Sequence, residues 1–481
     1  MENRFSLLIL AFLVILWRIV ALQNLPISLY VDEAQYWTWA QNLDFGYFSK
    51  PPLVGVLIFC STAFFGDGLI GVKFLAMLCY PATSLLIFAA ARRLKFSEQS
   101  AFWAGAIVLM MPIFAWLGLV VSTDALLSFF WALAFYFFIQ ASNENRFGDW
   151  LLVGLAVGLG LLSKYSMAVF LVSALCYRPK LLKSIAPWCA VLLAFLIVLP
   201  NILWNVANDF PTFKHTADIT IQKAAAGGFL KCLQFFIEQW LISGGIIFGI
   251  FAFLCCKKSL WKNQKFRLCA AFAIPFWAIV GAQAFLNNAN ANWAAPAFLS
   301  ASLAAMFFLE NRRKLLIWTF ALEMVIAVLA YHWIFFAKIF TDSPKIIHAP
   351  FVRAEGFKEL ADNLRPLLKA ESQRILVANN RTIIAHLRYE LRDLKTLKII
   401  AWNPNKTKNN YYQMATDLNN LKNADVFFIS SSPLNDDNLQ NIARFFGGFE
   451  KNMRFTVENR LDYPKRTLFL YKFNNFQGYA T

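Results

Sequence analysis

Long apolar runs separated by short polar loops fill the first two thirds of the chain. The first run, Phe5 to Leu22, follows Arg4 and precedes no small-residue cleavage site, so it predicts an uncleaved membrane span. Together the runs predict a polytopic α-helical membrane protein with about eleven transmembrane helices. The further runs are Leu69–Ala91, Ala101–Leu119, Ala125–Ala141, Leu151–Leu162, Ser166–Tyr177, Ile185–Trp204, Phe229–Cys256, Leu268–Leu286, Ala294–Leu309 and Leu315–Ala337.

Residues of about 33–65 break this pattern. The stretch from Ser49 to Phe65 is apolar, but Pro51, Pro52 and Gly55 interrupt it and it is too short to span a membrane alone. Together with Glu33–Phe48, which is rich in Trp and Tyr, it predicts interfacial helices at the level of the lipid headgroups.

The composition changes after Ala337, where charged residues and Asn appear every few positions. Short runs of β-forming residues alternate there with helical patterns, which predicts a small soluble α/β domain over residues 338–481 behind a membrane domain over residues 1–337. The predicted strands are Arg374–Ala378, Leu397–Trp402, Asp425–Ser430, Arg454–Val457 and Thr467–Phe473, and the predicted helices are Glu355–Leu368, Thr382–Leu391, Tyr411–Leu421 and Asp436–Phe446.

Charge orients the predicted spans. Clusters of Lys and Arg fall in alternate short loops, for example Arg92–Lys95 and Lys257–Arg267, and the positive-inside rule makes those loops cytoplasmic. The N-terminus is then cytoplasmic, and with an odd number of spans the C-terminal domain lies outside.

The net charge of +17 does not indicate nucleic acid binding, because the membrane part uses its basic excess as topology signals. The C-terminal domain also carries more Lys and Arg than Asp and Glu. A basic external domain suits membrane lipids with anionic headgroups or a polyanionic glycolipid. All eight Cys lie between Cys60 and Cys269, in or beside spans, which predicts neither structural disulfides nor a thiolate metal site.

Candidate carboxylates gather on the predicted outer side. Asp32 and Glu33 follow the first span, and Asp124 opens a later one. Two such acids can flank a reacting hydroxyl, one as a base and one holding the acceptor or orienting the base. The alternative for each is a helix cap that complements the helix dipole, and the residues alone leave it open.

Cations and aromatic residues accompany these acids. Lys50, Lys164 and Lys214 are candidates for holding a lipid-linked phosphate and stabilising it as a leaving group; for Lys50 the alternative is a side chain that snorkels to the interface. The candidates for sugar or acceptor binding are His215, Tyr36, Asn292 and Trp293, the last two in the Asn-rich stretch NNANANWAAPAF. That stretch also suits a polar turn with an interfacial Trp.

The motifs YVDEAQYW, FGYFSKPPL, STDALL, GLLSKYS and NWAAPAF occur in this order through residues 1–335. Together they resemble bacterial members of glycosyltransferase family 39, which include aminoarabinose and galacturonic acid transferases acting on lipid A or lipopolysaccharide core and are related to protein O-mannosyltransferases. The resemblance implies a GT-C fold, a polyprenyl-phosphate sugar donor and action at the periplasmic face of a bacterial inner membrane. It carries over Asp32 and Asp124 as the acidic residues, and Lys50 as the basic residue near the donor phosphate.

One position departs from the family pattern. Aminoarabinose transferases resemble EKPP where this chain has Ser49 before Lys50, Pro51 and Pro52. The loss of that Glu removes a metal-ligand candidate, so the sequence requires no cofactor and leaves a divalent metal open.

The resulting hypothesis is an inverting glycosyltransferase that modifies a lipopolysaccharide, lipid A or another cell-envelope glycan, with Asp32 as the base or acceptor-positioning acid. Two alternatives are a protein O-glycosyltransferase with the same donor and a transporter or flippase of lipid-linked sugar. Transporters bind substrate near the bilayer midplane, whereas the mid-span charges here, Lys73, Glu238 and Glu323, are few and the acids lie outside.

Overall fold

The computed structural model describes residues 2–144, 146–221, 228–370, 375–459, 461 and 463–479. The chain forms two compact units. Unit 1 comprises Met1–Asn24 and Leu43–Trp333, and unit 2 comprises Leu25–Asn42 and Ile334–Thr481. Residues 25–42, which contain Asp32, therefore belong to the same unit as the C-terminal residues. The boundary at residue 337 for the protein's functional domains stays a prediction.

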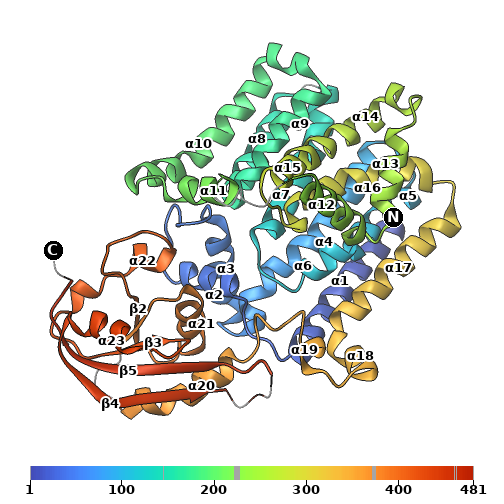
Figure 1. Cartoon of the computed structure of the whole chain (residues 1–481). Coiled ribbons are helices and arrows are strands. Elements are labelled where there is room, and N and C mark those ends of the chain that lie inside the picture. Colours follow the sequence, from blue (N-terminus) through green and yellow to red (C-terminus); the bar gives the residue numbers. More distant parts are fainter. Residues whose placement is uncertain are drawn as a thin grey trace. The chain divides into compact units, whose positions relative to one another are not determined.

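The regular secondary structure in the described residues of unit 1 is helical (Figure 1). Its helices are α1 (Glu2–Asn24), α3 (Leu53–Phe65), α4 (Leu69–Arg93), α5 (Glu98–Met110), α6 (Pro112–Leu117), α7 (Thr123–Glu144), α8 (Phe147–Ser163), η1 (Tyr165–Ala168), α9 (Val169–Tyr177), η2 (Pro179–Lys183), α10 (Ile185–Ala207), α11 (Pro211–Ile221), α12 (Phe229–Ile242), α13 (Ile246–Cys255), η4 (Leu260–Lys262), α14 (Gln264–Ala271), α15 (Ile274–Leu286), η5 (Ala291–Ala294), α16 (Ala295–Leu309) and α17 (Arg313–Tyr331).

Seven spans in the described part of the chain are long and apolar enough to cross a membrane, or eight if α12 and α13 count as one. The polytopic helical class is thus confirmed, while the count of eleven remains a prediction. The run Phe229–Cys256 was predicted as one span, but it bends by 116° between α12 and α13. Gly244 and Gly245 lie at this bend with φ of +70° and +75°, a left-handed conformation that glycine adopts without steric cost.

Small residues let the apolar helices approach closely. A Cβ added to Gly154 of α8 would lie 2.5 Å from the carbonyl oxygen of Ala190 in α10, and one added to Gly158 would lie 3.1 Å from the Cα of Ala194. The two pairs are four residues apart on each helix, so they lie on one face. Such small-residue faces are typical of helix contacts within membranes, where van der Waals packing supplies much of the association energy.

Unit 2 contains a five-stranded sheet with the order β2-β1-β3-β5-β4. Strands β1 (Ile375–Ala378), β2 (Lys398–Ala401) and β3 (Val426–Ser430) are parallel, whereas β5 (Thr467–Phe476) runs antiparallel to both β3 and β4 (Phe446–Glu458). The helices of this unit are α2 (Val31–Ala40), α18 (Trp333–Phe340), α19 (Pro344–Ile347), α20 (Phe357–Ala370), α21 (Arg381–Glu390), α22 (Tyr411–Ala415), η6 (Leu418–Leu421) and α23 (Asp436–Ala443).

The predicted small α/β domain is thereby confirmed, with differences at the ends of elements. Arg374 lies outside the described residues, and the predicted helix Tyr411–Leu421 is divided between α22 and η6. The helix predicted to reach Phe446 ends at Ala443, because Phe446 already pairs with Phe476 in the sheet. The apolar run predicted to end at Ala337 is likewise divided between α17 and α18.

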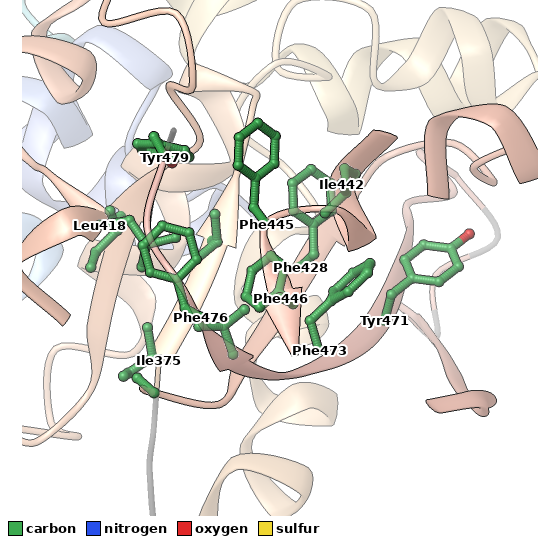
Figure 2. Packing of buried hydrophobic residues seen from close by; sticks show 14 of the residues in the cluster. Ile375, Leu418, Phe428, Ile442, Phe445, Phe446, Tyr471, Phe473, Phe476 and Tyr479 are labelled. Atoms are coloured by element: carbon green, nitrogen blue, oxygen red, sulfur yellow. The ribbon is translucent and has the colours of Figure 1, made fainter. Parts of the chain in front are cut away.

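Aromatic side chains form much of the core of unit 2. Figure 2 shows Phe428, Phe446, Phe473 and Phe476 among the residues packed on one face of the sheet. Val377 of β1 belongs to this cluster, while its neighbours Leu376 and Ala378 are buried outside it. Because successive side chains of a strand point to opposite faces, β1 is covered on both sides, as expected for a central parallel strand.

Candidate functional site

A loop of unit 1, residues 43–52, is fastened to α10 and α11. Asn201 donates a hydrogen bond to the carbonyl oxygen of Phe45 (2.7 Å), and Thr212 donates one to that of Tyr47 (2.8 Å). A Cβ on Gly46 would lie 2.4 Å from the Trp204 ring, so only glycine allows this approach. The FGYFSKPP motif is therefore a rigid support that fixes the backbone at Lys50.

Lys50 borders a cavity of about 230 Å³ that lies wholly within unit 1. Four of the predicted site residues line it: Lys50, Lys164, His215 and Trp293. They come from the 43–52 loop, the α8–η1 junction, α11 and η5. Further lining residues are Ser49, Pro51, Tyr165, Ser166, Val169, Thr216, Phe276, Ile279, Val280 and Gln283. The cavity thus combines two cations and an imidazole with an apolar wall from α15.

Lys164 projects from a break in the helices. Helix α8 ends at Ser163, and Lys164 has an extended backbone (φ −159°, ψ 130°) before η1 begins. Its Nζ donates a hydrogen bond to Oδ1 of Asp124 at 2.7 Å, while Asn292 Nδ2 donates one to Oδ2 of the same carboxylate at 2.8 Å. The Asp124 side chain is only 5% exposed. STDALL, GLLSKYS and NWAAPAF therefore meet in one cluster, Asp124–Lys164–Asn292, around a buried carboxylate.

Asp124 lies in the first turn of α7, where the helix dipole favours an acid, but its two oxygens bind side chains from other elements. It is not among the residues that line the cavity, whereas its partner Lys164 is. The geometry therefore makes Asp124 a group that holds Lys164.

Two buried cations fix the chain that leads into α7. Arg18 Nη2 donates a hydrogen bond to the carbonyl oxygen of Phe114 (3.2 Å), and Lys73 Nζ donates one to that of Leu119 (3.0 Å). A Cβ added to Gly118 would lie 2.3 Å from Arg18 Cζ. Lys73 thus supplies a donor to a carbonyl oxygen just after α6, and Arg18 adds a second donor to the Phe114 carbonyl oxygen, which also accepts the backbone N–H of Gly118.

The sequence analysis missed a polar group on α10. Asn201 and Asn205 are fully buried, and Asn201 Oδ1 accepts a hydrogen bond of 2.6 Å from the Tyr165 hydroxyl. Asn205 Oδ1 accepts one from the backbone N–H of Thr212 (3.3 Å). A sequence signal was present, because two Asn residues four positions apart share one face of an otherwise apolar helix.

The remaining predicted residues lie elsewhere. Lys214 is exposed on α11 and does not line the cavity. Asp32, Glu33 and Tyr36 lie on α2 in unit 2, where the Asp32 carboxylate forms an ion pair with Arg381 of α21. Tyr36 is buried beside Trp39, with ring centroids 4.8 Å apart.

Glu33 is buried and caps the start of α2. Its Oε2 accepts a hydrogen bond of 2.8 Å from the backbone N–H of Tyr30. The sequence analysis left a helix cap as the alternative role of Glu33, and this hydrogen bond is such a cap. A catalytic role for Glu33 stays a prediction. Among the described residues, no group of three or more His, Cys, Asp or Glu side chains is placed to hold a metal ion.

Comparisons with known proteins agree with this architecture. Residues 49–204 match the family model described as dolichyl-phosphate-mannose-protein mannosyltransferase. The chain is 30% identical over 411 residues to the lipid A galacturonosyltransferase RgtD of Rhizobium johnstonii. This alignment covers 83% of this chain and 85% of that protein. It is 28% identical over 173 residues to undecaprenyl phosphate-alpha-4-amino-4-deoxy-L-arabinose arabinosyl transferase 2 of Pseudomonas fluorescens, covering 35% of this chain and 28% of that one.

Solved structures show the same fold. ArnT of Cupriavidus metallidurans superposes with a TM-score of 0.64 in its apo state and 0.63 when bound to undecaprenyl phosphate. Each alignment covers 97% of both chains at 15% identity. Because RgtD is 30% identical over most of both chains, this protein belongs to the GT-C glycosyltransferases of family 39, and it is a multi-pass membrane enzyme that transfers a sugar.

Proposed function

We propose that this enzyme transfers a sugar from a polyprenyl-phosphate donor to lipid A or lipopolysaccharide core at the periplasmic face of a bacterial inner membrane. The observation that carries the proposal is the cavity of unit 1, in which Lys50, Lys164 and His215 surround space for a phosphate group next to an apolar wall. An amphiphilic donor, with a phosphate joined to a hydrocarbon chain, suits both parts of this lining.

In this reaction an acceptor oxygen attacks the anomeric carbon of the sugar as the bond from that carbon to the phosphate oxygen breaks. The proton of the acceptor hydroxyl passes to a base, and the polyprenyl phosphate leaves with its negative charge. Lys50 and Lys164 stabilise this developing charge, because fixed cations in a site with little water interact strongly with it. A single displacement of this kind inverts the anomeric configuration.

Asp124 and Asn292 are positioning residues in this mechanism. Two hydrogen bonds hold the Asp124 carboxylate, and its charge in turn holds the Lys164 ammonium group at the cavity. His215 and Trp293 line the same cavity and are assigned to the sugar. Asp32 is assigned as the base or acceptor-positioning acid, on the family resemblance of the YVDEAQYW motif.

Galacturonic acid is the first sugar to test, since the relative aligned over most of the chain is a lipid A galacturonosyltransferase. The experiment is mass spectrometry of lipopolysaccharide from cells with the native gene, a deletion, or a plasmid copy carrying Lys164→Met. The expected result is a loss of one hexuronic acid from lipid A or core in the deletion, restored by the native copy and not by the variant.

A different missing sugar would retain the transferase and reject galacturonic acid. An unchanged lipopolysaccharide in the deletion would overturn the proposed acceptor. Glycoprotein analysis of the same cells would then test the protein O-glycosyltransferase alternative, and assays of lipid-linked sugar movement would test the flippase alternative.

A further inference from the structure

Unit 2 contains a second cavity, of about 670 Å³, that none of the predicted site residues lines. The cavity is surrounded by the end of α21 and the chain that follows it, the start of β2, α22, η6 and the last turn of α2. All of these residues belong to unit 2, so the cavity is a property of that unit alone.

Four cations line this cavity: Arg388, Arg392, Lys395 and Lys398. The carboxylate that lines it is Asp417, whose Oδ1 accepts a hydrogen bond of 2.9 Å from the backbone N–H of Asn419. The lining therefore has a clear positive excess. Trp37 and Tyr411 also border the cavity, but both are buried, so little of their ring surface is open to a ligand.

The two arginines are held in place by the protein. Arg388 donates hydrogen bonds to the carbonyl oxygen of Ile399 from Nε (3.2 Å) and Nη2 (2.6 Å), and its guanidinium lies 5.2 Å from the centre of the Tyr412 ring. Arg392 Nη1 donates to the carbonyl oxygen of Tyr389 at 2.7 Å. Basic groups at the C-terminal end of a helix also complement its dipole, and this effect alone would account for both arginines.

Lys395 and Lys398 have no such explanation. Both lie beyond the end of α21 at Glu390, and both are exposed. In the part of the chain that the structure describes, no carboxylate forms an ion pair with Arg392, Lys395 or Lys398. Four cations face a single carboxylate, Asp417, in the lining of this cavity, so a net positive charge remains there and an anionic ligand would relieve the repulsion among the cations.

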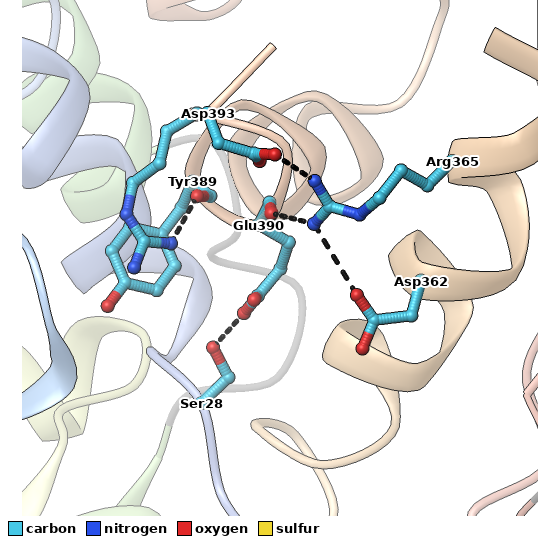
Figure 3. A network of polar contacts seen from close by, with 7 residues as sticks. Ser28, Asp362, Arg365, Tyr389, Glu390 and Asp393 are labelled. Carbon is cyan, nitrogen blue, oxygen red and sulfur yellow. Dashed lines mark hydrogen bonds and ion pairs between the residues drawn. The ribbon is translucent and has the colours of Figure 1, made fainter. Parts of the chain in front are cut away.

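The nearby acids are already bound elsewhere. Figure 3 shows the guanidinium of Arg365 between Asp362 and Asp393, with Glu390 turned toward Ser28. Arg365 also donates a hydrogen bond of 3.1 Å to the backbone carbonyl of Glu390. This network engages Asp362 and Asp393, and the cavity keeps a net positive charge although Glu390 attracts Arg392.

We propose that this cavity binds the anionic saccharide headgroup of the acceptor glycolipid, with phosphate or carboxylate groups on Arg392, Lys395 and Lys398. Guanidinium and ammonium groups are the usual partners of phosphate and carboxylate. The identity of the ligand as an acceptor rests on the proposed function, whereas the binding of an anionic saccharide does not.

The test is titration calorimetry on the purified full chain in detergent, with the deacylated, doubly phosphorylated glucosamine disaccharide of lipid A as the probe. The double variant Lys395→Glu/Lys398→Glu should weaken binding at least tenfold. The matched control Lys345→Glu/Lys369→Glu makes the same charge change at exposed lysines of unit 2 that do not line the cavity, and it should bind as the wild type does.

Three results would overturn the proposal: no binding by the wild-type protein, equal loss in the cavity and control variants, or inorganic phosphate that binds as tightly as the disaccharide. If the cavity variant instead lost affinity only for vesicles containing phosphatidylglycerol, the cavity would be a membrane contact and the saccharide assignment would fail. Binding that requires the cavity, in a protein whose deletion leaves lipopolysaccharide unchanged, would support this inference while overturning the proposed function.

Discussion

The ammonium group of Lys164 donates a 2.7 Å hydrogen bond to Oδ1 of Asp124, and the two side chains are only 16% and 5% exposed. The two residues are forty positions apart, at the end of α8 and the start of α7. Removing one partner of such a shielded pair destabilises the protein, because the remaining charge stays buried without an opposite charge beside it.

We expect Asp124→Asn to destabilise the protein by about 3–5 kcal/mol, the usual cost of breaking a buried pair from one side. Thermal unfolding in detergent, followed by tryptophan fluorescence, measures this loss. The double variant Asp124→Asn/Lys164→Met should recover part of the melting temperature but no transfer activity, since the cavity then lacks its cation. Equal melting temperatures for wild type and Asp124→Asn would contradict the importance of the pair.

Asn292 should contribute through its single contact with Asp124. Removing this hydrogen bond to a charged group in Asn292→Ala should cost about 1.5–3 kcal/mol and reduce transfer by roughly tenfold, as the carboxylate gains freedom. Asn288→Ala is the control, because Asn288 is an exposed residue of the same Asn-rich stretch. The prediction fails if the two alanine variants transfer sugar at the same rate.

Asn292→Asp should be more harmful than Asn292→Ala at neutral pH, because it places a second carboxylate against Asp124. Two adjacent carboxylates repel each other when both are charged, and a proton shared between them relieves that repulsion. Lowering the pH should then restore part of the activity, since the protonated carboxyl can donate the hydrogen bond that the amide supplied. A pH profile of transfer for both variants checks this sign, and parallel profiles would reject it.

The ion pair between Asp32 and Arg381 separates two roles for Asp32. If Asp32 acts on the acceptor, Asp32→Asn should reduce transfer by at least about a hundredfold, in the range expected for a lost acid or base. Arg381→Gln breaks the same ion pair and leaves the carboxylate, so it should cost far less. Equal losses in the two variants would show that Asp32 matters only for the structure of unit 2.

His386 should make unit 2 sensitive to acid. Its ring is buried and stacked on Phe357 with centroids 3.5 Å apart, and burial lowers its pKa to about 3. His386 takes up a proton below pH ~6.5 in the unfolded chain, but only below about pH 3 in the folded chain. The free energy of unfolding therefore decreases by roughly 1.4 kcal/mol for each unit that the pH falls within this window.

We expect His386→Leu to lose this contribution, so that the variant gains stability relative to wild type as the pH falls from 7 to 4. Melting temperatures of both proteins across this range measure the difference. A constant difference at every pH would mean that His386 does not titrate on unfolding.

The pattern of side chains along the chain predicted the elements well, because hydrophobic periodicity is a local property. The apolar runs marked most of the long helices of unit 1, although none predicted α11 and the run Ala101–Leu119 is divided between α5 and α6. Short β-forming runs marked the strands of unit 2, such as the parallel strand Leu397–Trp402 observed as β2. The same pattern predicted Phe229–Cys256 as one helix, since apolar composition does not reveal a bend made by Gly244 and Gly245.

The chemistry of the site was predictable only as a set of residue types. The sequence by itself determined which cations, acids and aromatic residues were available, and charge in the loops suggested a common side. Which of them touch depends on how far each helix is rotated about its axis and where it breaks. These features follow from packing between segments far apart in the chain, such as the contact of Gly46 with Trp204.

Tertiary structure alone decided that Asp124 holds Lys164 and Asn292, that Lys214 stays outside the cavity and that Glu33 caps its own helix. A carboxylate at the start of a helix can bind the helix or a distant cation, and the two arrangements have similar sequences. Both carboxylates are buried and need donors, so the choice depends on which donor the packing brings within reach: the ammonium group of Lys164 for Asp124, and the backbone N–H of Tyr30 for Glu33.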